Sequence, residues 1–76
     1  MPTIDREHGL NFVIYVDDHL PPHVHVMGRG TARIMLEPAV ALDYARGLSK
    51  ADIGRALDVV ESRQLEMLEA WKRIHG

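Results

Sequence analysis

The amino-terminal half of the chain shows the two-residue alternation that is typical of β-strands. Residues 10–16, 23–27 and 31–36 are runs rich in β-branched, aromatic or other apolar residues, and turn-forming Gly, Pro or Asp residues stand beside them. Alternation over residues 39–44 predicts a fourth strand, although its alanines fit a helix equally well. Residues 1–9 end in His-Gly, which we interpret as a turn before the first strand.

The carboxy-terminal third changes to a helical period. Ser49 is a candidate N-cap with Asp52 three positions later, and an apolar stripe with 3.6-residue spacing follows through about residues 50–75. Gln64 interrupts this stripe, so one continuous helix and two shorter helices both remain open. A continuous helix would be about 39 Å long, more than a small sheet can cover, which favours a homo-oligomer or another partner at this helix.

These elements predict an α+β fold in a single domain of residues 1–76. We expect a small antiparallel sheet of three to four strands packed on a long C-terminal helix. With residues 28–30 as a three-residue loop, Val24 pairs with Ile34 and His25 with Arg33. A shift of one residue would split the apolar face, so His25 and Arg33 should lie side by side on the face away from the helix.

Composition narrows the function classes. The chain has 76 residues, 46% of them hydrophobic and 26% charged, which is typical of a globular domain. Its net charge of −2 argues against a sequence-blind binder of duplex nucleic acid, and the absence of cysteine excludes disulfides and thiolate metal sites. No apolar run is long enough to span a membrane, and the first residues lack the features of a signal peptide, so we expect a cytoplasmic protein.

The most distinctive stretch is residues 17–26, which contains three of the five histidines, two carboxylates and a Pro-Pro pair. His23 and His25 lie two apart on a predicted strand, so their rings project from the same face. His19 is held nearby by the short Pro-Pro connection, and Asp17 or Asp18 could reach the same space.

One interpretation is metal-independent acid–base cleavage of a phosphodiester, as in ribonucleases. Imidazoles titrate near neutral pH, so one can accept a proton while another donates one. In this interpretation His23 and His25 are the catalytic acid and base. His19 and Asp18 complete the set of catalytic residues. Arg33 and Arg29 would bind phosphate, and Tyr15 could stack a base or donate a proton. No cofactor is needed for this chemistry.

Two other interpretations compete. His19, His23 and His25 could hold one divalent transition metal ion such as zinc, although Arg33 opposite His25 would repel a cation. Alternatively, the histidines could form a hydrogen-bonded ladder with a purely structural role.

Several segments together resemble one protein family over essentially the whole chain. They include Gly9, the strand from Phe12 to Tyr15, the triplet around Arg33 and the Leu-Glu-Ala-Trp ending at Trp71. The most specific is Asp-His-x-Pro-Pro-His-Val-His, intact from Asp18. The chain resembles a small bacterial family catalogued as domain of unknown function (DUF) 4160.

Members of that family are often encoded beside a small protein with a helix-turn-helix, in an arrangement similar to a type II toxin–antitoxin pair. The resemblance thus implies that this chain is the toxin-like partner of a cognate antitoxin-like small protein. It also gives importance to His19, His23 and His25 without implying a mechanism. Our leading hypothesis is a toxin-like component that acts on RNA through the histidine face. The alternative is a non-enzymatic binding module whose histidines hold a divalent metal or a partner protein.

Overall fold

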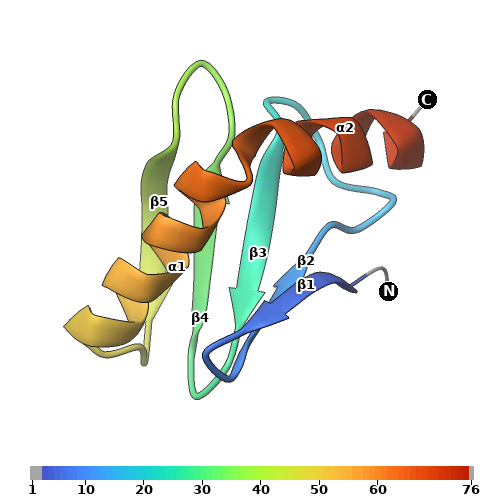
Figure 1. Ribbon diagram of the computed structural model, residues 1–76. Helices are drawn as coiled ribbons and strands as arrows, with labels where there is room; N and C mark the ends of the chain where they lie inside the picture. Colours follow the sequence, from blue (N-terminus) through green and yellow to red (C-terminus); the bar gives the residue numbers. More distant parts are fainter. Residues whose placement is uncertain (1–2, 76) are drawn as a thin grey trace.

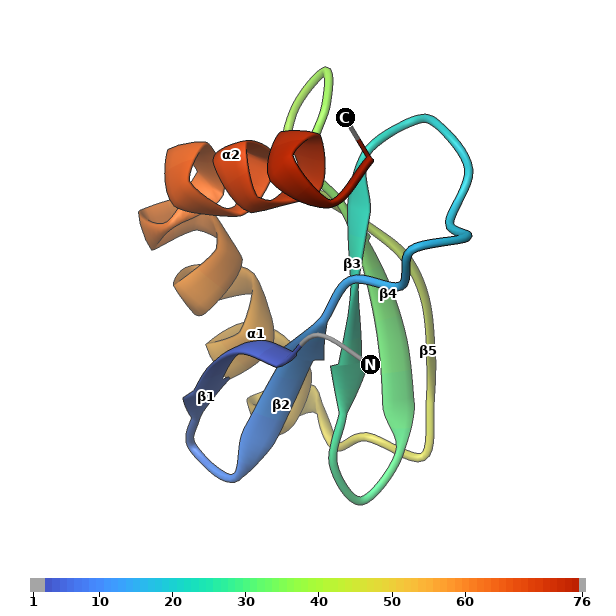
Figure 2. The same ribbon diagram turned by 90° about the vertical axis from the view of Figure 1, so that its right-hand side faces the viewer.

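The computed structural model describes residues 3–75 as one antiparallel sheet with two helices on one of its faces (Figure 1). The elements in chain order are β1 (Thr3–Glu7), β2 (Leu10–Val13), β3 (His23–Met27), β4 (Thr31–Met35), β5 (Ala41–Arg46), α1 (Lys50–Ser62) and α2 (Gln64–His75). The five strands form a meander, because each pairs with its neighbour in sequence. Figure 2 shows both helices on the same side of the sheet.

The α+β class and the antiparallel sheet are confirmed, but the expected three to four strands are wrong: the sheet has five. The missed strand is β1, which has one strongly apolar residue, Ile4, and three charged ones, so its pattern gives no strand signal. A tight turn folds it onto β2, since His8 and Gly9 both have positive φ, at 56° and 73°. The bounds of three strands also differ: β2 stops at Val13, β4 ends at Met35 instead of residue 36, and β5 covers residues 41–46 instead of 39–44.

The predicted pairing of β3 with β4 is confirmed residue by residue. Val24 lies opposite Ile34 and His25 opposite Arg33. Val24 and Ile34 are fully buried, whereas His25 and Arg33 are partly exposed on the other face. The alternation of apolar and polar residues therefore sets the register of this hairpin.

The prediction of one long C-terminal helix is wrong, because the helical region is interrupted at Arg63 and forms two helices. Arg63 has the non-helical ψ of 21°, and its N–H bonds to the carbonyls of Val59 and Val60. The next residue, Gln64, donates from Nε2 to the carbonyl of Leu36 at 2.8 Å. This polar contact explains the interruption of the apolar stripe. The argument for an oligomer or another partner assumed one continuous helix. Because the helix is interrupted, that argument no longer applies.

The core lies between the helix-facing side of the sheet and the inner faces of α1 and α2. Its buried residues include Phe12, Ile14, Val24, Val26, Ile34 and Leu36 from the sheet side, and Ala56, Val59, Val60, Met67, Ala70 and Trp71 from the helices. After the break, α2 turns across the end of the sheet where β3 begins (Figures 1 and 2). That course brings Trp71 to the first residue of β3, His23. Within residues 3–75, neither helix is long and apolar enough to cross a bilayer.

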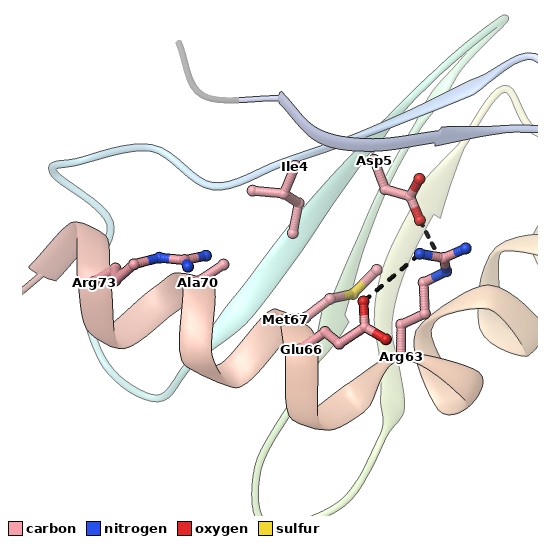
Figure 3. Close-up of a pocket in the computed structure, with 7 residues that line it drawn as sticks. All are labelled: Ile4, Asp5, Arg63, Glu66, Met67, Ala70 and Arg73. Atoms are coloured by element: carbon pink, nitrogen blue, oxygen red, sulfur yellow. Dashed lines mark ion pairs between the residues drawn. The ribbon is translucent and has the colours of Figure 1, made fainter.

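Arg63 also ties the helix break to the edge strand. Its Nε lies 3.2 Å from carboxylate oxygens of both Asp5 and Glu7, and its Nη1 lies 3.6 Å from Glu66. Asp5, Arg63 and Glu66 line a cavity of about 200 Å³, and Figure 3 shows the ion pairs of Arg63 with the two carboxylates. Because 43% of the Arg63 side chain is exposed to solvent, each ion pair contributes little to stability, about 0–1 kcal/mol.

Replacing Gln64 with alanine should destabilise the fold, because the Leu36 carbonyl loses its side-chain donor at a partly buried position. We expect the free energy of unfolding to fall by about 1 kcal/mol, measured by urea denaturation. The matched control is Leu65→Ala at the next position, where the side chain is 75% exposed and the change should stay within about 0.5 kcal/mol. Equal effects of the two substitutions would contradict this account of the break.

Candidate functional site

The segment between β2 and β3 begins with a turn that fixes the Asp18 side chain. The N–H of Asp18 donates to the carbonyl of Tyr15 at 3.1 Å, and the N–H of Tyr15 donates back to Asp18 Oδ2 at 3.0 Å. An aspartate at the end of a strand commonly closes a turn in this way. The other carboxylate oxygen, Oδ1, is left to face β3.

His23 is the first residue of β3, and its ring is fixed from two sides. Nδ1 donates to the carbonyl of Pro21 at 2.8 Å, so in the neutral ring Nε2 carries the lone pair. That Nε2 lies 3.6 Å from Asp18 Oδ1. The indole of Trp71 packs at a centroid distance of 5.2 Å, and the side chain of His23 is only 3% exposed.

His25 completes the cluster from the same face of β3. Its Nε2 donates to Asp18 Oδ1 at 3.1 Å, and its ring lies 5.0 Å from that of His23. Tyr15 contacts the His25 ring edge-on at 4.9 Å. With 18% of its side chain exposed, His25 is the more accessible of the two histidines.

One ligand atom each from Asp18, His23 and His25 lies within 4.8 Å of the other two. A zinc ion with bonds of 2.0–2.2 Å in tetrahedral geometry needs ligand atoms about 3.4 Å apart. The separations of 3.1 and 3.6 Å between Asp18 Oδ1 and the two Nε2 atoms bracket that value. Two imidazoles and a carboxylate also form a donor set that suits divalent transition metals.

The electrostatics of the cluster favour an ionised carboxylate. Burial of the Asp18 carboxyl acts to raise its pKa. The hydrogen bonds from the Tyr15 N–H and from His25, together with the charge that His25 and His23 carry when protonated, outweigh burial and lower the pKa below the ordinary 3.8. Asp18 is therefore available as an anionic ligand over the whole neutral range.

Arg33 lies across from His25 but is already paired. Its Nε is 3.1 Å from Asp43 Oδ2, an ion pair without hydrogen-bond geometry. The carboxylate offsets the positive charge on this face, which weakens the repulsion expected between Arg33 and a cation. Asp43 lies in β5, between Leu42 and Tyr44, at the point where the pairing of β5 with β4 shifts its register. No local sequence pattern predicts this shift.

The other residues singled out in the sequence lie outside this cluster. His19 is exposed in the β2–β3 segment, and Arg29 is exposed in the β3–β4 turn. Among residues 3–75, the group of His, Asp and Glu side chains able to share a metal ion consists of Asp18, His23 and His25. Asp18 thus occupies the position that the metal hypothesis gave to His19. The cavity in Figure 3 has no histidine in its lining.

Sequence reasoning did not anticipate the part played by Trp71. Its helical spacing places it in the core, as expected, but its contact with His23 depends on the turn of α2 after Arg63. His75, which stacks on Trp71, was likewise not singled out. A histidine one turn after a tryptophan at a helix end is the available signal, and it is weak.

Comparison with known proteins gives one family. The family model described as "Domain of unknown function (DUF4160)" matches residues 9–72, and the chain belongs to this family. No curated protein and no solved structure matches the chain. The matched region contains the whole Asp18–His23–His25 cluster.

The lowered pKa of Asp18 predicts the acid dependence of stability. The carboxylate stabilises the folded chain above the ordinary carboxyl pKa, and that contribution is lost as the pH falls through the lowered folded value. Asp18→Asn removes the titration, so its free energy of unfolding should fall less steeply than that of the wild type below about pH 4. Urea denaturation at a series of pH values measures both slopes. Asp17→Asn, at the exposed neighbour, is the control and should keep the wild-type slope. Identical slopes for Asp18→Asn and wild type would contradict the shift.

Proposed function

We propose that this member of the DUF4160 family binds one divalent transition metal ion, such as Zn²⁺, through Asp18, His23 and His25. The observation that carries the proposal is the convergence of the two Nε2 atoms on Asp18 Oδ1, at 3.1 and 3.6 Å. Those two separations lie on either side of the edge length of a tetrahedral zinc site, and all three ligand atoms lie within 4.8 Å of one another.

The hydrogen bonds that orient the proposed ligand side chains support the same function. Metal-binding histidines usually donate their second ring nitrogen to a carbonyl or carboxylate, which fixes the tautomer and the ring orientation. His23 does so to the carbonyl of Pro21. The carboxylate of Asp18 is oriented in turn by the N–H of Tyr15. His25 donates its Nε2 proton to Asp18 in the metal-free chain, so its neutral ring would have to move that proton to Nδ1 before Nε2 can bind a metal. Because protons compete with a metal ion for imidazole nitrogens, metal affinity should weaken as the pH falls.

Three protein ligands leave at least one coordination position for water or another small ligand. The open position would lie on the side of His25, whose side chain is 18% exposed, because His23 packs against Trp71. We propose a binding module that presents a metal ion at the end of its sheet.

Titration with Zn²⁺ or Co²⁺ tests the proposal. Wild-type protein without a purification tag should bind one equivalent, and Asp18→Asn and His25→Ala should each weaken binding by at least about 10-fold. Isothermal calorimetry measures the affinity, and circular dichroism checks that the variants are folded.

His19→Ala is the matched control, since it removes an exposed histidine of the same segment and should leave the affinity unchanged. The proposal fails if the wild type binds no stoichiometric metal. A loss of affinity with His19→Ala, equal to that with Asp18→Asn, would favour the three-histidine set instead.

A second candidate is cleavage of RNA by a cytoplasmic, toxin-like component of a toxin–antitoxin pair. The Asp18–His25 hydrogen bond favours it, because a carboxylate that orients an imidazole leaves the second ring nitrogen free to act as a base. Arg33 on the adjacent strand would bind the phosphate after exchange from Asp43. The burial of His23 counts against a direct role for it in proton transfer with RNA.

Expression in bacteria tests this second candidate. We expect growth arrest by the wild type, relief of the arrest by co-expression of the small protein encoded beside it, and loss of arrest in His25→Ala. Cleavage of RNA by purified protein should persist in the presence of a chelator, because the acid–base route uses no metal. Arrest that survives His25→Ala in a folded variant would exclude this candidate.

A further inference from the structure

The last residue of α2, His75, links that helix to the segment that carries Asp18. Its Nδ1 lies 2.9 Å from the carbonyl oxygen of Trp71, and its Nε2 lies 3.1 Å from the carbonyl oxygen of Tyr15. Its ring stacks on the indole of Trp71 at a centroid distance of 3.8 Å and an interplanar angle of 25°. The contact to Tyr15 spans 60 positions of the sequence.

The two acceptors determine which form of the His75 ring fits. A carbonyl oxygen accepts hydrogen bonds and cannot donate one, and a neutral imidazole has a single N–H. Both contacts can therefore be hydrogen bonds only when the ring is doubly protonated. Its surroundings suit a cation, because His75 lies at the negative end of a helix and over the face of a tryptophan.

Both partners of His75 also touch the candidate ligands. The Tyr15 carbonyl accepts from the Asp18 N–H as well as from His75, and the Tyr15 N–H orients the Asp18 carboxylate. Trp71 packs against His23. His75 thus contacts the residues that support two of the three proposed ligands.

We infer that His75 is a positioning residue: its doubly protonated ring holds Tyr15 and Trp71 in place, and with them Asp18 and His23. We call its contacts with Tyr15 and Trp71 the His75 latch. The functional part of the inference rests on the proposed function, since the latch would affect the metal affinity of the same site. The latch itself requires no metal. When the ring loses either proton, one of the two hydrogen bonds must break, and the Asp18 segment loosens.

The charged and titratable groups on the segments that meet at the latch are of both signs. They are Glu66, Glu69, Lys72 and Arg73 on α2, Tyr15, Asp17, Asp18 and His19 on the β2–β3 segment, and His23 and His25 on β3. The basic residues of α2 disfavour a charged ring, and the carboxylates of both segments favour it. Lys72 and Arg73 are exposed and therefore screened by solvent, whereas Asp18 is joined to the latch through Tyr15.

Nuclear magnetic resonance on the metal-free protein tests the latch directly. The ¹⁵N chemical shifts of the His75 ring should show both nitrogens protonated near pH 5.5, and exchange protection of the Asp18 amide should decline as the pH is raised to about 8. His75→Arg has a permanent charge and several N–H donors, so protection should no longer vary with pH. His75→Phe keeps the stacking but has no donor, so protection should be low throughout.

The Co²⁺ affinities of the same two variants test whether His75 affects the proposed metal site. Near pH 7, His75→Arg should bind Co²⁺ about 10-fold more tightly than His75→Phe, as expected for a residue that supports a ligand. His8→Asn is the control, because it removes an exposed histidine at a turn position that asparagine tolerates.

A singly protonated ring near pH 5.5, or protection in His75→Phe equal to the wild type at every pH, would overturn the inference. Equal Co²⁺ affinities of the arginine and phenylalanine variants would remove the link to the site. If the wild type binds no Co²⁺ while the exchange pattern follows this expectation, the latch stands and the proposed metal function fails.

Discussion

The Asp18 carboxylate, held between two imidazoles, is the interaction on which the rest of the site depends. A charge that is largely removed from water must be compensated by hydrogen bonds or by opposite charge. Asp18 accepts hydrogen bonds from the Tyr15 N–H on one oxygen and from His25 on the other, with His23 nearby. These contacts join the segment that follows β2, which ends at Val13, to the beginning of β3.

The fold supplies two things to that interaction. The hairpin of β3 and β4 directs the histidines to one face, and its buried valines and isoleucine fix the register. The break at Arg63 then directs α2 across the start of β3, so that Trp71 covers His23. A straight continuation of α1 would not follow the course that α2 takes across the sheet (Figure 1). Gln64, which anchors the break to Leu36, is therefore as much a part of the site's architecture as of the core.

The sequence allowed the β3–β4 register to be predicted because Val24, His25 and their partners alternate strictly between apolar and polar. It did not allow β1 to be predicted, since that strand is largely polar and is held by pairing with β2. In the histidine cluster, the sequence motif predicted contributions from both His19 and Asp18, and the turn around Asp18 brings the carboxylate to the imidazoles while His19 stays exposed. Contacts across the fold, such as that between Arg33 and Asp43, depend on a register shift and leave no local signal.

The most direct measurement of the central claim is the X-ray absorption spectrum of the protein loaded with one equivalent of zinc. Binding through Asp18, His23 and His25 predicts two imidazole nitrogens and at least one oxygen at about 2.0–2.2 Å from the metal. It also predicts that His25→Ala removes one imidazole from the spectrum. A spectrum with oxygen neighbours alone, unchanged by that substitution, would contradict the account.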